Sequence, residues 1–307
     1  MDGVVMSNQK TLAGVLPVFQ TPFRDDETID ERVLEREIDW LLAHGIDGIV
    51  MAMVSEVLRL SHDERKELAK TACQLVRGRA TVTISVGAES THVAEELGRH
   101  AESVGADAVM AIPPISVGVG EEELLRYYSR IIRSIAIPVV VQDASSYVGK
   151  PLSIPLYVKM LQEFGDRLYF KPEATPIGPR LSALRDGTKG KARVFEGTGG
   201  IALVDSYRRG IVGTMPGADL VGAIVPLWNA LQRGDEPAVN RISGPLVALV
   251  SLQNSLDAFL AIEKHLLVKQ GVFENTVVRG PVGYVMDSET QREVDRLFEL
   301  MMAAVKS

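Results

Sequence analysis

Short apolar segments rich in β-branched residues alternate with longer segments of helical period along most of this chain. The apolar segments occupy residues 14–19, 48–52, 81–86, 108–112, 138–141, 168–170, 193–195 and 211–214. Helical patterns separate or follow them, for example at residues 30–44, 61–76, 91–104, 121–135, 154–163 and 220–232. Apolar strands separated by single helices are typical of a parallel sheet that helices cover on both faces. Eight such units with right-handed crossovers predict an α/β fold, a (β/α)8 TIM barrel.

A doubly wound open sheet is the alternative that the same alternation allows. Sheets of that kind often bind dinucleotides through a Gly-x-Gly-x-x-Gly turn directly after the first strand. No such turn follows residues 14–19, and the closed barrel is therefore favoured.

The starts of the predicted helices carry residues that such positions prefer. Asp30, Ser61 and Thr91 open three of them, and Glu64 stands three residues after Ser61, as in a capping box. Gly45 follows the first helix, where a left-handed residue commonly ends the helical backbone. The helical periods and their boundary residues thus agree.

Three further helical patterns follow the eighth apolar segment, at residues 237–252, 256–269 and 288–305. They are too short and too amphipathic to need a core of their own. We therefore predict one domain, in which residues 11–233 form the barrel and residues 234–307 a C-terminal three-helix extension.

Charge and cysteine content exclude several functional classes. With 33 basic and 40 acidic residues, a net charge of −7, the chain offers no basic surface to nucleic acid or to an anionic membrane. Its single cysteine, Cys73, leaves no intramolecular disulfide or thiolate metal cluster and fits a cytoplasmic protein. No apolar run approaches the roughly 18 residues of a membrane span. The first ten residues also lack the pattern of a signal peptide.

The segment at residues 168–173 reads Leu-Tyr-Phe-Lys-Pro-Glu, an apolar strand that ends on a lysine. Lysine is among the residues least often buried, so Lys171 at this place needs a reason. Desolvation disfavours the ammonium form and frees the amine to attack a carbonyl. The alternative is a lysine whose stem packs while its charged head reaches water.

Active sites of (β/α)8 barrels form at the carboxyl ends of the strands. Lys171 lies at the end of the sixth predicted strand, and Gln142 ends the fifth. Residues 197–200 after the seventh strand read Gly-Thr-Gly-Gly, which can cradle an anion with backbone amides or simply form a tight turn. The five histidines all fall in predicted helices, away from the strand ends, so we expect no metal site.

These strand ends resemble the dihydrodipicolinate synthase/N-acetylneuraminate lyase family of class I Schiff-base lyases. The resemblance rests on the opening segment at residues 14–23, on Phe-Lys-Pro-Glu at residues 170–173 and on the turn that begins at Gly197. It runs over almost the whole chain, and it implies that Lys171 forms an imine with a 2-keto acid. It also implies a homotetramer and no cofactor, since the lysine imine itself is the electron sink.

Departures from the family pattern indicate which reaction to expect. The second-strand loop, usually Gly-Thr-Thr-Gly-Glu, reads Ala-Met-Val-Ser-Glu at residues 52–56. Gln142 stands where a proton-relaying tyrosine is usual, and Tyr147 where the synthases carry an arginine for a second carboxylate. Gln142 cannot titrate; Glu173, two residues past Lys171, can. The resemblance is greatest to the branch that acts on 2-keto-3-deoxy sugar acids, including 2-keto-3-deoxyarabonate dehydratase.

The predicted site therefore has Lys171 as the imine-forming residue, Glu173 as the general base and Gln142 as a hydrogen-bonding partner of the substrate. The remaining predicted contacts of the substrate are with Thr21, Val54, Ser55, Glu56, Gly197 and Thr198. Backbone amides of residues 52–56 would hold the keto-acid carboxylate, aided by the hydroxyl of Ser55 or Thr21, and Gln142 and Thr198 would hold sugar hydroxyls. The alternative for Glu173 is a structural carboxylate that pairs with an arginine or faces solvent.

Three functions remain open at this stage. A dehydratase of a 2-keto-3-deoxy sugar acid is favoured, because retro-aldol cleavage needs a base at the C4 hydroxyl and the usual tyrosine is absent. A pyruvate-dependent aldolase or a 4-hydroxy-tetrahydrodipicolinate synthase is the first alternative. A barrel that binds a keto acid without turning it over is the second.

Overall fold

The computed structural model describes residues 11–145, 147–148 and 150–307 of the 307-residue chain. The first ten residues, in which we found no signal-peptide pattern, lie outside this part. In the described residues the strands are β1 (Gly14–Val15), β2 (Gly48–Met51), β3 (Thr81–Ser85), β4 (Ala108–Ala111), β5 (Val139–Gln142), β6 (Leu168–Lys171), β7 (Phe195–Glu196) and β8 (Gly213–Thr214). Each overlaps a predicted apolar segment, although β7 shares only Phe195 with the predicted residues 193–195.

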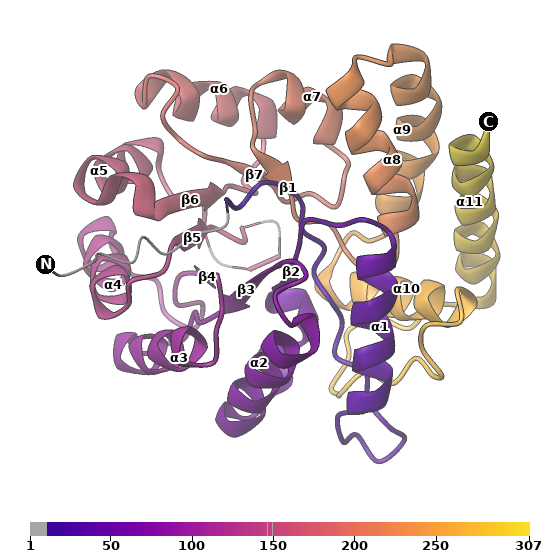
Figure 1. The fold of residues 1–307 in the computed structure, drawn as a ribbon, viewed down its shortest axis with the longest axis horizontal. Coiled ribbons are helices and arrows are strands. Elements are labelled where there is room, and N and C mark those ends of the chain that lie inside the picture. Colours follow the sequence, from indigo (N-terminus) through magenta and orange to yellow (C-terminus); the bar gives the residue numbers. More distant parts are fainter. Residues whose placement is uncertain (1–10, 146, 149) are drawn as a thin grey trace, which may run out of the picture.

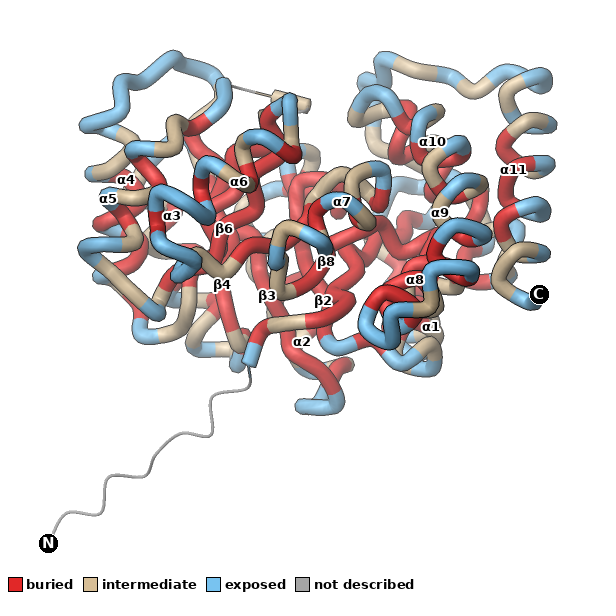
Figure 2. Tube along the Cα trace, turned by 90° about the horizontal axis from the view of Figure 1, so that it is seen from above, coloured by how far each residue is buried: buried red, intermediate tan, exposed pale blue. Residues whose placement is uncertain are grey.

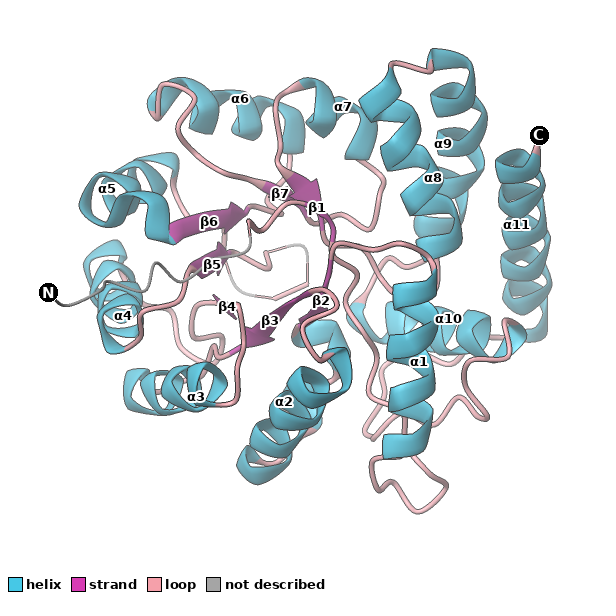
Figure 3. Ribbon diagram, in the orientation of Figure 1, coloured by secondary structure: helices cyan, strands magenta, loops and turns pink. Residues whose placement is uncertain are grey.

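The strands close into a barrel through parallel pairs (Figure 3). Strands β2 to β6 pair in sequence order, and β1, β8 and β7 form a second group. Single bridges join the two groups, Val18 to Val50 on one side and Phe170 to Val194 on the other. The fold is the predicted (β/α)8 barrel. The first strand is shorter than predicted because Pro17 has no N–H to donate, and pairing resumes only at Val18.

Helices surround the barrel in chain order (Figure 1). They are α1 (Glu31–Ala43), α2 (His62–Val76), α3 (Thr91–Ser103), α4 (Glu121–Ser134), α5 (Ile154–Phe164), α6 (Ile177–Gly187), α7 (Leu203–Arg208) and α8 (Val221–Arg233). Their inner faces and the strands form the buried interior, and their outer faces are exposed (Figure 2).

The predicted helix caps are confirmed with one exception. Asp30 caps α1, Ser61 caps α2, and Glu64 completes the capping box with Ser61. The prediction for α3 is wrong by one residue, because Ser90 has the extended backbone of the cap and Thr91 is already helical. Side-chain acceptors thus satisfy the first backbone donors of α1 and α2.

The strands present alternate residues to two different cores. In β6, Leu168 and Phe170 belong to the core between the sheet and the helices. Tyr169 packs inside the barrel with residues such as Val140. Because side chains alternate along a strand, Lys171 shares the inward side with Tyr169.

Three helices follow the barrel, α9 (Glu236–Val250), α10 (Leu256–Lys269) and α11 (Ser288–Lys306). Helices α9 and α11 pack on α8 at the periphery, whereas α10 lies closer to the barrel and contacts the turn at residues 53–55 (Figure 1). Of the helices described, none combines the length and apolar composition that a membrane span requires.

Candidate active site

The site is built at the carboxyl ends of β5 and β6. The parallel register places Gln142 of β5 directly beside Lys171 of β6. Lys171 is 4 % exposed and Gln142 is 3 % exposed. The two polar side chains therefore lie together at the inner mouth of the barrel, nearly removed from bulk water.

Glu173 joins both of these side chains. Its Oε1 accepts hydrogen bonds from Lys171 Nζ at 2.6 Å and from Gln142 Nε2 at 2.7 Å. Glu173 is itself 1 % exposed, so Lys171 and Glu173 form a buried ion pair, not a surface one. A carboxylate oxygen so close to the amine can exchange a proton with it directly.

Asp143 fixes the backbone that carries this carboxylate. Its Oδ1 accepts a hydrogen bond from the backbone N–H of Glu173 at 2.9 Å. Burial raises the pKa of Asp143, and the nearby charge of Glu173 acts in the same direction. The end of β5 thus supports the Lys171–Glu173 pair through two consecutive residues, Gln142 in the strand and Asp143 directly after it.

Gly197, after β7, allows the pair to pack as it does. A Cβ atom at this position would lie 2.7 Å from Cε of Lys171 and 2.9 Å from Oε1 of Glu173. Both distances are too short for a side chain to fit without displacement. A glycine is needed here because there is no space for a side chain, and not because of a left-handed backbone, since φ of Gly197 is not in that region.

A pocket opens next to these residues. Lys171, Glu173, Gln142 and Gly197 form part of its lining. The other lining residues are Val18, Ala52, Met53, Val54, Tyr147, Gly199, Met215, Pro216, Gly217 and Phe259. Within the described part of its lining, Lys171 is the one cation. The pocket therefore combines a buried amine, a carboxylate and a neutral amide.

Tyr147 and Phe259 form part of the wall that we did not predict from sequence. Their rings meet edge to face with centroids 6.4 Å apart, and both line the pocket. Burial raises the pKa of Tyr147, and the charges of nearby carboxylates, Glu173 first among them, add to this. Tyr147 drew notice as a replacement for arginine, but no local signal marks Phe259, which comes from α10.

The predicted contacts near the second-strand loop do not all line the pocket. Of the predicted substrate contacts in this part of the site, Val54 lines the pocket, whereas Ser55 and Thr21 are not part of the lining. The hydroxyl of Ser55 donates to Phe19 O at 2.6 Å and accepts from Ala52 N at 3.0 Å. The hydroxyl of Thr21 donates to Ser55 O at 2.5 Å. Both hydroxyls thus bind backbone atoms of the loop or of the segment that follows β1, and their contact with a substrate carboxylate stays a prediction.

Glu56 and Thr198, two further predicted substrate contacts, also bind other residues of the protein. Glu56 lies outside the pocket lining, where its carboxylate pairs with Lys264 Nζ at 2.5 Å. The hydroxyl of Thr198 donates to the carboxylate of Glu196, and its backbone N–H donates to Glu196 Oε1 at 2.6 Å. Glu56 and Thr198 thus already bind other residues of the protein. Of residues 197–200, only Gly197 and Gly199 line the pocket.

In the described part of the chain, no three histidine, cysteine or carboxylate side chains are grouped as a metal site would require. The five histidines lie in helices or at a helix end, away from the pocket.

Comparison with known proteins agrees with this geometry. Residues 11–175 match the dihydrodipicolinate synthetase family. The chain belongs to this family. Its members form Schiff bases and act as lyases, aldolases or dehydratases, and the chain is accordingly an enzyme of this class.

One curated relative is the L-2-keto-3-deoxyarabonate dehydratase of Azospirillum brasilense, which is 30% identical over 274 residues, 88% of each chain. Among solved structures, the 4-hydroxy-tetrahydrodipicolinate synthase of Methylacidiphilum fumariolicum SolV superposes with a TM-score of 0.87 at 21% identity, over 96% of this chain and 98% of that one. A prophage protein of the dihydrodipicolinic acid synthase family from Escherichia coli K12 was solved in complex with pyruvate. It superposes with a TM-score of 0.85 at 24% identity, over 95% of this chain and 99% of that one. At these identities the two structures support the fold.

Proposed function

We propose that this enzyme is a dehydratase of a 2-keto-3-deoxy sugar acid, such as 2-keto-3-deoxyarabonate, and that it acts through a Schiff base on Lys171. The observation that carries the proposal is the buried group in which one oxygen of Glu173 accepts hydrogen bonds from both Lys171 and Gln142. The name of the Azospirillum brasilense relative, which aligns over most of the chain, supports the same assignment.

Imine formation begins with a proton transfer across the 2.6 Å contact between Lys171 Nζ and Glu173. The neutral amine attacks the C2 carbonyl of the keto acid and gives a carbinolamine. Glu173 then returns its proton to the departing C2 hydroxyl, which leaves as water. The resulting iminium is the electron sink for the next step.

Dehydration uses the same carboxylate a second time. Glu173 removes a proton from C3, and the electron pair of that C–H bond moves into the iminium to give an enamine. The enamine expels the C4 hydroxyl, which leaves as water with the proton that Glu173 held. Hydrolysis of the remaining imine frees Lys171 and the product. General acid–base assistance of this kind contributes roughly 10² to 10⁴ in rate.

The charges around the pocket favour a substrate with one carboxylate. Lys171 is consumed as the nucleophile, and the described lining offers no second cation. The carboxylates of Glu173, Glu263, Asp219 and Glu196 all act on Tyr147 in the pocket wall. A second substrate carboxylate, as a synthase of dihydrodipicolinate type requires, would find no further cation in the described lining and would meet the carboxylate of Glu173. Neutral sugar hydroxyls suit Gln142 and the phenol of Tyr147.

The aldolase alternative needs a base at the C4 hydroxyl. Gln142 has no basic group, and Tyr147 is held in its neutral form because burial raises its pKa. Its phenol can donate a hydrogen bond to a substrate hydroxyl more readily than it can remove a proton from one. This observation favours water loss over carbon–carbon cleavage.

The proposal is tested by trapping the imine and by product analysis. Incubation with pyruvate and borohydride should add one reduced adduct to the intact protein, and peptide mapping should place it on Lys171. The second buried lysine, Lys264, is the internal control and should stay unmodified. A panel of 2-keto-3-deoxy acids should then yield dehydration products, with little pyruvate. Absence of the adduct would rule out the Schiff base, and pyruvate as the main product would favour the aldolase.

Assembly and location are separate proposals. We retain a homotetramer from the family resemblance and a cytoplasmic location from the cysteine content. Light scattering of the purified protein and fractionation of cells would test the two independently.

A further inference from the structure

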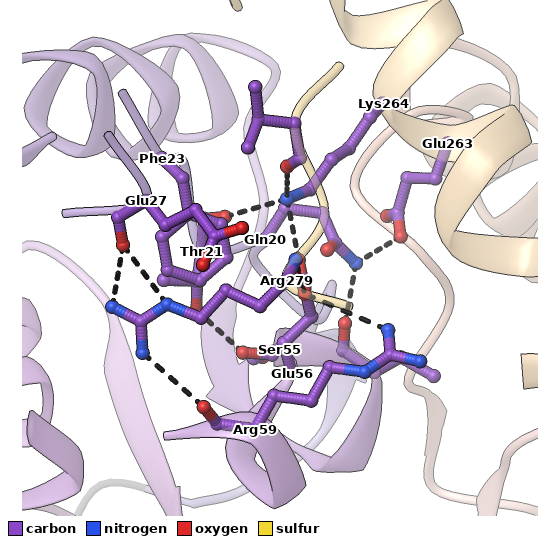
Figure 4. A network of polar contacts seen from close by, with 12 residues as sticks. Gln20, Thr21, Phe23, Glu27, Ser55, Glu56, Arg59, Glu263, Lys264 and Arg279 are labelled. Carbon is purple, nitrogen blue, oxygen red and sulfur yellow. Dashed lines mark hydrogen bonds and ion pairs between the residues drawn. The ribbon is translucent and has the colours of Figure 1, made fainter. Parts of the chain in front are cut away.

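Two consecutive ionisable residues of α10, Glu263 and Lys264, are buried beside the loop that follows β2 (Figure 4). Each is 0 % exposed. Burial raises the pKa of Glu263 well above its usual range, and the carboxylates of Asp219 and Glu37 act in the same direction. A charge in such a place is stable only with partners of opposite charge or with strong hydrogen bonds. Their partners include residues of two segments near the start of the chain, residues 20–23 and 54–56, together with Ala218 and Val277.

Among the described residues, Lys264 has three oxygen partners, one in an ion pair and two in hydrogen bonds. Nζ pairs with Oε1 of Glu56 at 2.5 Å, and it donates to the carbonyl oxygens of Thr21 at 3.0 Å and Val277 at 2.6 Å. The ring of Phe23 lies against it, with its centroid 4.7 Å from Nζ. Burial lowers the pKa of Lys264, and the charge of Glu56 opposes this. This lysine is enclosed and holds Glu56.

Glu263 reaches the same loop through Gln20. Its Oε1 accepts from the backbone N–H of Ala218 at 2.6 Å, and its Oε2 accepts from Nε2 of Gln20. The same amide nitrogen of Gln20 donates to the carbonyl oxygen of Val54 at 2.8 Å. One side chain thus connects α10 to a residue that lines the pocket.

The loop between these two anchors has an unusual backbone. Residues 53–55 form one turn of 3₁₀ helix, and Glu56 follows in the left-handed region with φ of 60°. A residue other than glycine in this region persists only where its surroundings impose it. The ion pair to Lys264 and the hydrogen bond to Val54 O hold the loop on both sides of Ser55.

We propose that Glu263 and Lys264 are positioning residues, which fix the backbone of Met53 and Val54 where it receives the carboxylate of the keto acid. The inference rests on the proposed function, because it assumes that this part of the pocket binds that carboxylate. It assigns to the C-terminal extension a role in substrate binding, through residues that do not contact the substrate.

Two variants test the proposal with little change in volume. Glu263→Gln replaces an acceptor of two hydrogen bonds by an amide that can accept only one of them. The double variant Glu56→Gln/Lys264→Met removes both charges of the second anchor and leaves no buried charge unpaired. Glu37→Gln is the matched control, since Glu37 is equally buried and binds the backbone N–H of Gln20 at 2.8 Å but does not touch the loop.

We expect KM for the keto acid to rise about tenfold in both variants while kcat changes by less than about threefold. The control should keep both constants near the wild-type values. Borohydride at saturating pyruvate should still label Lys171 fully in every variant. A higher KM with nearly unchanged kcat and full labelling distinguishes weaker substrate binding from damage to the catalytic lysine.

Several results would overturn the inference. Wild-type KM values in folded variants, or a fall in kcat at constant KM, would show that the anchors do not act on binding. Failure of both variants to fold would show that the contacts serve stability alone. If wild-type enzyme itself forms no pyruvate adduct, the proposed function fails and the inference with it. An adduct on wild type with unchanged KM in the variants removes only the inference.

Discussion

Two buried lysine–glutamate pairs occur in this enzyme, one at the tip of β6 and one between α10 and the second-strand loop. Lys171 and Glu173 meet at 2.6 Å, and Lys264 and Glu56 meet at 2.5 Å. All four side chains are at most 5 % exposed. Burial and ion pairing therefore do not distinguish them.

Access to the pocket does distinguish them. Lys171 and Glu173 line it, and Gln142, which donates to Glu173, is a side chain that can also bind substrate. Lys264 is closed off by two backbone carbonyls and an aromatic ring. The first pair can give up its contacts during a reaction, whereas the second can only hold the backbone in place. A lysine becomes a candidate nucleophile when it is buried and still open to a ligand.

Lys171→Ala should show the largest effect, at least about a 10³-fold loss of kcat/KM for the keto acid, because no other group forms the imine. Steady-state assays and intact mass after borohydride treatment measure it. Lys171→Arg is the matched control, since it keeps the charge next to Glu173 and has no nucleophilic amine. Activity in the arginine variant would mean that charge, not imine formation, carries the reaction.

Glu173→Gln should lower the rate of dehydration by about 10² to 10⁴, because the amide cannot accept the C3 proton. Slow labelling by pyruvate and borohydride should persist, since Lys171 remains. Asp143→Asn, a change in a neighbouring buried carboxylate, should lose less than about tenfold. Full dehydration activity in Glu173→Gln would contradict the assignment of the base.

Lys264→Met should act mainly on stability. It removes the nearer counter-ion of the buried Glu56 carboxylate and leaves the ion pair with Arg59, whose guanidinium lies 3.9 Å away. The free energy of unfolding should fall by about 3 kcal/mol. Urea denaturation measures this loss. Adding Glu56→Gln should restore part of it, since the poorly compensated charge is then gone. Equal stability of the single and double variants would show that the two charges are not coupled.

Gly197→Ala should reduce activity by about 10² without unfolding the protein. Its Cβ would press on Cε of Lys171 and Oε1 of Glu173, and small displacements of reacting groups have effects of that size. Gly244→Ala is the control, because outside its chain neighbours and the adjacent backbone of its own helix no heavy atom of the described residues lies within 4 Å of the new Cβ. Rates and melting temperatures of both variants would be compared. Normal kinetics in Gly197→Ala would show that the pair tolerates movement.

Glu37→Gln should change the pH dependence of stability. Burial raises the pKa of Glu37 to about 8, against the opposing effects of Gln20 N–H and Lys264. The folded state therefore keeps the proton of Glu37 up to higher pH than the unfolded chain does. The contribution of Glu37 to the free energy of unfolding is complete below about pH 4 and declines as the pH rises to about 8. Between pH 6 and 8 wild type should lose roughly 2 kcal/mol more than the variant. If urea denaturation gave the same pH dependence of the free energy of unfolding for wild type and variant, this prediction would be refuted.

Local patterns were sufficient to predict the barrel and the place of Lys171. The alternation of strands and helices is repeated along the chain, and the rule that sites lie at carboxyl ends of strands selected residue 171. The helix caps at Asp30 and Ser61 were equally local, since each depends on residues within one turn.

The orientation of side chains was less predictable. The hydroxyls of Ser55, Thr21 and Thr198 were expected at the substrate, but they bind backbone atoms or Glu196. A hydroxyl next to a strand end has many possible acceptors within one or two residues, and sequence does not rank them. The roles assigned to Lys171, Glu173 and Gln142 remain proposals, for which the geometry now provides distances.

The sequence by itself determined the order of the strands and helices, the apolar strand that ends on Lys171, and the family. Only the tertiary structure decided that Lys171 turns into the barrel, because a continuous apolar strand carries no alternation that marks its inner face. It also brought Glu263 to Gln20, 243 residues away in the chain, and Phe259 into the pocket wall. Such contacts depend on how α10 packs against the closed barrel, and no local pattern encodes them.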